Sequence, residues 1–165
     1  MYDASHAGRA RALLMAPNWM GVSAAALDIA RQVAGRGHVV LVADLYGRDV
    51  RPQNGDEAGA AMMPLKNDRP CCASACRQCW RPLRGQALAA VDTDPPGRLR
   101  FCFGGCCVLE LACDGAELKA FVSFHGTLIR RTRRMPGISR GAVLVLDGAS
   151  DPLVPREQLP ASPGR

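Results

Sequence analysis

The chain has 165 residues, a length that fits one domain with a substantial core. Hydrophobic residues make up 48% of it and aromatic residues only 5%, and no apolar run approaches the roughly 20 residues of a membrane span. The net charge is +6, but the 19 arginines are scattered and no aromatic platform accompanies them. We therefore expect one α/β domain over residues 1–165, located in the cytoplasm, with no nucleic-acid or membrane partner.

The first third of the sequence predicts a strand, a helix and a second strand. Residues 11–17 are an apolar run ended by proline, and residues 39–43 are a second, fully apolar run. Between them, Ser23 suits the N-cap of a helix with apolar residues at helical spacing, and Gly35 and Gly37 suit its end. This order predicts a parallel sheet with a right-handed crossover.

The middle of the chain is less regular. We expect a polar loop over residues 53–59 and an irregular, cysteine-rich segment over residues 66–82, because neither a helical stripe nor strand alternation is evident there. Residues 86–91 resume a helix-like composition, and residues 92–97 are rich in turn-forming residues. Arginines gather at residues 130–137, which predicts an exposed basic loop.

The cysteine-rich segment admits two further interpretations. Cys76-x-x-Cys79, with Cys72 four residues earlier, has ligand-like spacing, although a structural zinc site generally needs four ligands and no second paired motif follows. Alternatively, CCASACRQCW written with G/C-ending codons and read one base earlier gives the amphipathic LLRQRLQAVL, so a local reading-frame slip is a second hypothesis, extended to the C-terminal LPASPGR. Eight cysteines without a secretory signal argue for reduced thiols in either case.

The stretch Phe101-Cys102-Phe103-Gly104-Gly105, followed by an apolar run at residues 108–112, is typical of a nucleophile elbow. At such a strand-to-helix turn, backbone N–H groups face the developing oxyanion, and the helix N-terminus favours a thiolate over a thiol. We expect a Cβ at residue 104 to collide with the turn. An ordinary buried cysteine before a glycine-started helix gives the same local pattern, so both interpretations remain open.

The rest of the chain predicts one helix and two strands. The helix after the elbow runs to about Cys113. A strand over residues 120–124 ends at His125, and a strand over residues 142–146 is followed by an exit loop over residues 147–154.

Five motifs, in this order, resemble the dienelactone hydrolase family, a branch of the α/β-hydrolases that uses a Cys-Asp-His triad. They are APNWMGVS at 16–23, GHVVLVADLYGR at 37–48, FCFGG at 101–105, FVSFHG at 121–126 and VLVLDGASDPLVPREQ at 143–158. The resemblance implies a three-layer α/β-hydrolase fold with a mostly parallel sheet, incomplete at the C-terminus. It also implies hydrolysis of a small-molecule lactone or carboxylic ester without a metal or other cofactor.

Carried over residue by residue, the resemblance makes Cys102 the nucleophile, Asp151 the acidic triad member, and the N–H groups of Phe103 and Trp19 the oxyanion hole. The family's triad histidine lies beyond the acidic member, where this sequence has none. His125 leaves its strand on the correct side and is the candidate replacement base. We therefore expect an impaired hydrolase.

Two residues are candidates for substrate binding, Tyr46 and Arg48. The family often has a carboxylate at the end of the first strand, where it controls the resting thiol. This sequence has Asn18 there, so the resemblance does not imply the same activation of the thiol. A second function class is a non-catalytic truncated relative, or a binding module on the same scaffold, because a fold does not fix a function.

Overall fold

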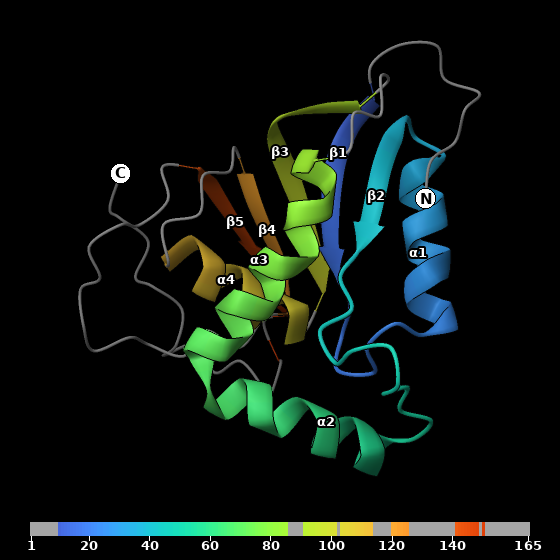
Figure 1. Cartoon of the computed structure of the whole chain (residues 1–165), viewed down its shortest axis with the longest axis vertical. Coiled ribbons are helices and arrows are strands. Elements are labelled where there is room, and N and C mark those ends of the chain that lie inside the picture. Colours follow the sequence, from blue (N-terminus) through green and yellow to red (C-terminus); the bar gives the residue numbers. More distant parts are fainter. Residues whose placement is uncertain are drawn as a thin grey trace.

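The computed structural model describes residues 10–85, 91–101, 103–113, 120–125, 141–148 and 150. Within them the chain forms five strands and four helices (Figure 1). The strands are β1 (Ala10–Ala16), β2 (His38–Val42), β3 (Val91–Phe101), β4 (Ala120–Phe124) and β5 (Ala142–Leu146). The helices are α1 (Ala24–Ala34), α2 (Gly55–Asn67), α3 (Arg69–Gly85) and α4 (Phe103–Cys113).

The predicted strand, helix and strand at the start of the chain are confirmed as β1, α1 and β2. Ser23 caps α1, because its hydroxyl accepts a hydrogen bond from the N–H of Ala26 at 3.3 Å. The capping residue at the other end is Gly35, whose N–H donates to the carbonyl of Arg31 at 2.9 Å. β1 and β2 pair in parallel, with Arg11 opposite His38.

All five strands are parallel and follow the order β2-β1-β3-β4-β5. Alternate residues of β1 face opposite sides of the sheet, as the pleat of a strand requires. Met15 packs with α1 on one side, whereas Leu14 packs with α3 and α4 on the other. The described residues therefore form three layers, with helices on both faces of the sheet.

The two helical layers bury different kinds of side chain. On the α1 face, three alanines of the helix lie against Met15 and Val40. The opposite face is larger and includes several cysteines. Its buried members are Ala10, Ala12, Leu14, Ala16, Val39, Ala43, Leu45, Cys72, Cys76, Cys107, Leu111 and Phe121.

The polar loop expected over residues 53–59 is wrong, because helix α2 begins at Gly55. Asn54 caps it by accepting from the N–H of Glu57 at 3.0 Å, and a carboxylate oxygen of Glu57 accepts from the N–H of Gln53 at 2.8 Å. An asparagine followed three residues later by glutamate is a helix start signal that the sequence contained. The polar composition of the segment masked it.

The irregular segment expected over residues 66–82 is also wrong. Its first residues end α2, and α3 spans Arg69–Gly85. Asp68 caps α3, because its carboxylate accepts from the N–H of Cys71 at 3.0 Å. Cys72, Cys76 and Cys79 follow one another at spacings of four and three residues, which is a helical stripe made of cysteine. We missed it because cysteine was considered as a ligand rather than as a small hydrophobic residue.

The turn-rich break expected over residues 92–97 falls inside β3. The strand pairs with β1 through Asp92 and again from Gly97 onward, and the register shifts between these points. Pro95 and Pro96 occupy the shifted part, and proline has no N–H to donate to a neighbouring strand. The break is therefore a bulge within one strand. Of the helix-like residues 86–91, Val91 opens β3 and the others lie outside the described residues.

The predicted helix after the elbow and the two strands after it are confirmed as α4, β4 and β5. The expected basic loop at residues 130–137 lies outside the described residues. Within the part of the chain that the structure describes, no helix combines the length and the hydrophobicity needed to cross a bilayer.

Candidate active site

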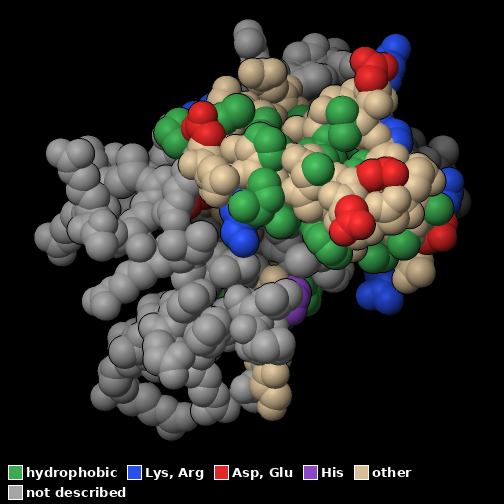
Figure 2. Space-filling view, turned by 90° about the horizontal axis from the view of Figure 1, so that it is seen from below, with side chains coloured by type: hydrophobic (Ala, Val, Ile, Leu, Met, Phe, Trp, Pro, Cys, Tyr) green, Lys and Arg blue, Asp and Glu red, His purple; other side chains and the backbone are tan. Residues whose placement is uncertain are grey.

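The strand order marks one place at the edge of the sheet as a binding site. The chain leaves β1 toward β2 on one side, and it later enters β3 on the other side of β1. Open parallel sheets bind ligands outside the carboxyl ends of the strands at such a switch point. In Figure 1 this is the lower end of the molecule, across which α2 lies. Seen from that end, hydrophobic side chains are interspersed with charged ones (Figure 2).

The junction of β3 and α4 has the dimensions of a nucleophile elbow. β3 ends at Phe101 and α4 begins at Phe103, so one residue, Cys102, joins strand to helix. Cys102 itself lies outside the described residues. The two elements that flank it nevertheless place the start of α4 at the carboxyl end of the sheet.

Gly104 lets the start of α4 touch the end of β1. A Cβ at this position would lie 2.7 Å from the carbonyl oxygen of Pro17 and would overlap the carbonyl oxygen of Ala16. A Cβ at residue 104 therefore does collide, and the atoms that it meets belong to the end of β1 and the residue after it. The contact brings the helix N-terminus beside the loop that follows β1.

That loop, Asn18-Trp19-Met20-Gly21, is a tight turn. The side chain of Asn18 accepts from the N–H of Met20 at 3.0 Å, and its carbonyl accepts from the N–H of Gly21 at 3.0 Å. Gly21 has a φ of +66°, and a Cβ there would lie 2.9 Å from the ring of Tyr46. Asn18 thus uses its side chain to shape the turn that presents Trp19.

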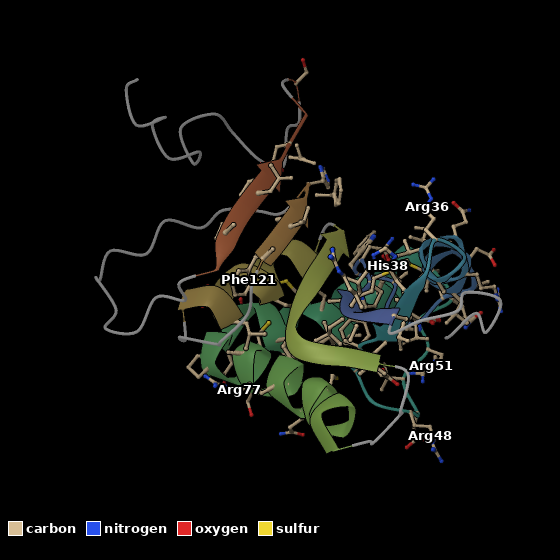
Figure 3. All side chains as sticks on the ribbon, turned by 90° about the horizontal axis from the view of Figure 1, so that it is seen from above. Arg36, His38, Arg48, Arg51, Arg77 and Phe121 are labelled. Atoms are coloured by element: carbon tan, nitrogen blue, oxygen red, sulfur yellow. The ribbon has the colours of Figure 1, made fainter. Side chains whose placement is uncertain are left out.

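Tyr46, expected to bind substrate, holds the same loop. Its hydroxyl donates to the carbonyl oxygen of Trp19 at 2.8 Å. The Trp19 side chain is 37% exposed, and its ring would lie 3.5 Å from a Cβ at Gly55, the first residue of α2. The loop after β1 is therefore held by Tyr46, which follows β2, and lies against the start of α2. Arg48, the other expected substrate residue, is exposed and points outward in Figure 3.

An ion pair that sequence reasoning missed lies beside Tyr46. The guanidinium of Arg51 donates to the carboxylate of Asp44 at 2.7 Å, and it also donates to the carbonyl of Gly47 at 2.6 Å. Asp44 accepts in addition from the N–H of Gly47 at 3.1 Å. These bonds close the turn after β2 and bring Arg51 back toward the strand end. Two charged residues seven positions apart in a loop carry no sequence signal of pairing.

His125 lies at the carboxyl end of β4, as expected. Its φ of 54° is in the left-handed region, where few non-glycine residues occur, and its N–H donates to the carbonyl of Leu146 at 2.8 Å. Phe124 pairs with Phe101, so the chain leaves β3 and β4 at the same level. His38 begins β2 and belongs to the opposite end of the sheet (Figure 3).

Asp147 directly follows β5 and is an acidic residue that the sequence reasoning did not select. Both of its carboxylate oxygens are shielded from solvent. The expected acidic member, Asp151, lies outside the described residues. Both aspartates follow β5 in the sequence, so the position after an apolar strand was the available signal.

The cysteines considered as metal ligands have different bonding partners. Cys79 donates to the carbonyl of Asp44 at 3.6 Å, whereas Cys72 lies against Cys107 of α4, with 2.9 Å between the two sulfur atoms. Among the described residues, no three His, Cys, Asp or Glu side chains are placed to hold a metal ion together.

Comparison with known proteins gives one family. The sequence matches the profile of the dienelactone hydrolase family over residues 1–162. The structure is similar to m3DLH, with a TM-score of 0.84 and 35% identity, and to the dienelactone hydrolase-like promiscuous phosphotriesterase P91 from metagenomic libraries, with a TM-score of 0.82 and 30% identity. Esterase PE8, with a TM-score of 0.58 and 14% identity, shares the fold alone. A search of curated proteins found no match.

The matches cover nearly all of this chain but only part of each similar structure. The comparison with m3DLH covers 95% of this chain and 65% of the other, and that with P91 covers 95% and 64%. For esterase PE8 the shares are 96% and 77%. The chain thus spans slightly less than two thirds of the length of m3DLH and of P91.

Proposed function

Because the chain belongs to the dienelactone hydrolase family and has its α/β-hydrolase fold, we propose that it cleaves a small-molecule lactone or carboxylic ester with Cys102 as nucleophile. The observation that carries the proposal is the one-residue junction between β3 and α4 at the switch point of the sheet. A cysteine in that position follows a strand directly and precedes a helix N-terminus, which favours its thiolate.

The oxyanion hole of this proposal consists of the N–H groups of Phe103 and Trp19. The close approach of Gly104 to Pro17 supports it. Phe103 directly precedes Gly104, and Trp19 lies two residues after Pro17. Tyr46 holds the carbonyl of the same residue, which fixes the orientation of the loop. Preorganised donors of this kind stabilise the negative charge that develops on the carbonyl oxygen.

The reaction takes place in two steps. The Cys102 thiolate adds to the carbonyl carbon, the bond to the leaving oxygen breaks, and an acyl-enzyme forms while the enolate or alcohol departs. Water then attacks the acyl-enzyme, which needs a base to accept its proton. Among the three histidines of the 165 residues, only His125 follows a strand at its carboxyl end.

His125 is the candidate for this base. It leaves β4 at the level where Cys102 follows the paired strand β3, and neighbouring strands lie about 4.8 Å apart. Asp151 is proposed as the acidic member that orients the base, since it follows β5, the neighbour of β4. Tyr46 is proposed as a support of the Trp19 loop rather than as a substrate ligand.

An activated aryl ester tests the proposal. We expect a burst of about one equivalent of product, because acylation outruns deacylation, followed by slow turnover. Cys102→Ala should abolish the burst, and Cys71→Ala, which removes an exposed cysteine of α3, should leave it unchanged. A burst that survives in Cys102→Ala contradicts the proposal. Turnover that disappears in His125→Ala while the burst remains would identify His125 as the base.

The name of P91 makes phosphotriesters a second substrate class to test. The chain is 30% identical to that protein over 95% of its own length. A thiolate can attack phosphorus as it attacks a carbonyl carbon. Release of the aryl alcohol from an aryl phosphotriester, lost in Cys102→Ala, would support this class.

The alternative is a non-catalytic relative or a binding module on the same scaffold. It is compatible with the family and the fold, because a fold does not fix a function. An aryl ester that gives neither burst nor turnover, together with tight binding of a lactone, would support this alternative.

We also propose that the chain works in the cytoplasm. Six of the described cysteines are reduced thiols, as is usual in a reducing compartment: Cys71, Cys72, Cys76, Cys79, Cys106 and Cys107. Detection of the chain in a soluble cytoplasmic fraction would support this location, and detection in a secreted fraction would contradict it.

A further inference from the structure

Three buried cysteines meet where α3 packs against α4. Cys72 and Cys76 belong to α3 and Cys107 to α4, and we call these three the thiol cluster. Their exposed fractions are 3%, 0% and 0%. The sulfur atoms of Cys72 and Cys107 lie 2.9 Å apart, and Cys76 hydrogen-bonds to both of the others. The proposed ester hydrolysis uses none of them.

Helix geometry explains why these cysteines and not their neighbours meet. Cys72 and Cys76 are four residues apart and share one face of α3, which is the face toward the sheet. The next residue, Arg77, points outward from α3 in Figure 3. The adjacent cysteines Cys71 and Cys106 are exposed and partly buried, respectively. Two neighbouring pairs, 71 and 72 in α3 and 106 and 107 in α4, thus each contain one cluster member and one matched control.

The surroundings raise the pKa of two members of the cluster, Cys72 and Cys107. The hydrogen bond with Cys107 lowers the pKa of Cys72, but the hydrogen bond with Cys76 and burial raise it, and the net pKa lies well above the ordinary value of 9.0. The hydrogen bonds with Cys72 and Cys76, followed by burial, raise the pKa of Cys107. Thiols react as thiolates, so the cluster reacts slowly and faster at higher pH.

We propose that Cys72 and Cys107 form a reversible disulfide that joins α3 to α4 when the protein meets a peroxide. The 2.9 Å between the sulfur atoms needs to shorten by only about 0.9 Å to reach the length of a disulfide bond. One thiol gives up its proton and attacks the peroxide, which yields a sulfenic acid and one water. The second thiol then displaces the hydroxyl group as a second water. Two thiols and one hydrogen peroxide thus give one disulfide and two waters.

The bond would fasten the elbow helix to its neighbour. α4 begins directly after Cys102, and its start rests on the end of β1 through Gly104. A link between residues 72 and 107 closes a loop of 35 residues that includes β3, which reduces the freedom of the unfolded chain. We therefore expect the oxidised protein to have a higher Tm than the reduced protein.

Peptide mapping under non-reducing conditions tests the inference. The folded protein is treated with hydrogen peroxide, its remaining thiols are alkylated, and it is digested with trypsin. Cleavage after lysine and arginine places Cys72 in peptide 67–77 and Cys107 in peptide 101–119. We expect these two peptides to be joined, with the bond between Cys72 and Cys107 located by fragmentation, and to separate after treatment with dithiothreitol.

Matched variants decide which cysteines form the bond. The joined peptides should persist in Cys71→Ser and Cys106→Ser, and they should be lost in Cys72→Ser and Cys107→Ser. Joined peptides that persist in Cys72→Ser, or a wild-type protein whose two peptides remain separate after oxidation, would overturn the proposal. The test measures no ester hydrolysis, so its outcome is independent of the catalytic role of Cys102.

Discussion

Strands β2 and β5 have similar sequences and very different surroundings. β2 reads HVVLV and β5 reads AVLVL, and each lies at one edge of the described sheet. Val39 and Val40 are 6% and 1% exposed, whereas Val143 and Leu144 are 52% and 50% exposed. An apolar run therefore predicted a strand correctly in both places, but not its burial.

The difference lies in the layers that cover each strand. β2 lies against α1 on one face, and on the other its Val39 belongs to the core that α3 and α4 complete. Among the described elements, β5 packs mainly against β4. Helices cover both faces of a parallel strand in a complete α/β sheet. The comparison teaches that the helical layers, more than the strand sequences, decide where this molecule is well packed.

Two leucines provide the strongest test of this comparison. Leu14 of β1 is fully buried beside β2, and Leu144 of β5 is half exposed. We expect Leu14→Ala to lower the free energy of unfolding by about 2–5 kcal/mol, because it leaves a cavity. Leu144→Ala should change it by less than about 1 kcal/mol. Urea denaturation of both variants measures the difference, and equal losses would mean that β5 is as well packed as β1.

Gly104 tests how closely the start of α4 packs against the end of β1 at the candidate site. Gly104→Ala forces a Cβ against the carbonyl oxygens at the end of β1, so we expect a loss of about 1–3 kcal/mol in the free energy of unfolding. The aryl-ester burst should fall as well, because Phe103 and Trp19 move apart. Gly59→Ala of α2 is the control, since a Cβ there meets nothing within 4 Å. A stable, fully reactive Gly104→Ala variant would contradict the proposed contact.

The pH dependence of stability tests only the part of the sheet that α3 and α4 cover, because β5 contains no thiol. The pKa values of Cys72 and Cys107 are raised in the folded state, so the unfolded chain loses these protons first as pH rises. The contribution of these thiols to the free energy of unfolding is fully present below about pH 9. Above that pH it falls, by at most about 1.4 kcal/mol per pH unit for each thiol. Chemical denaturation between pH 7 and roughly 10.5 measures the slope. Cys72→Ala should make it shallower, and an unchanged slope would exclude this origin.

The candidate site could be predicted in part. The strand-to-helix junction was recognisable because a cysteine between phenylalanines is followed by two glycines and an apolar run, and Gly104 proved to be needed at a close contact. The role of Tyr46 was not recognisable. Its hydroxyl bonds to Trp19, 27 residues earlier, and nothing in the local sequence indicates such a partner. Arg51 and Asp44 were missed for the same reason.

The sequence by itself determined the succession of strands and helices around the first crossover and the elbow. Those elements follow from spacing, caps and glycines, which act over a few residues. Only the tertiary structure decided that the cysteine-rich segment is a helix and that β5 stays half exposed, because both depend on which distant surfaces a face meets. Cys72 and Cys76 of α3 are buried together with Cys107 of α4, and α1 covers one face of β2.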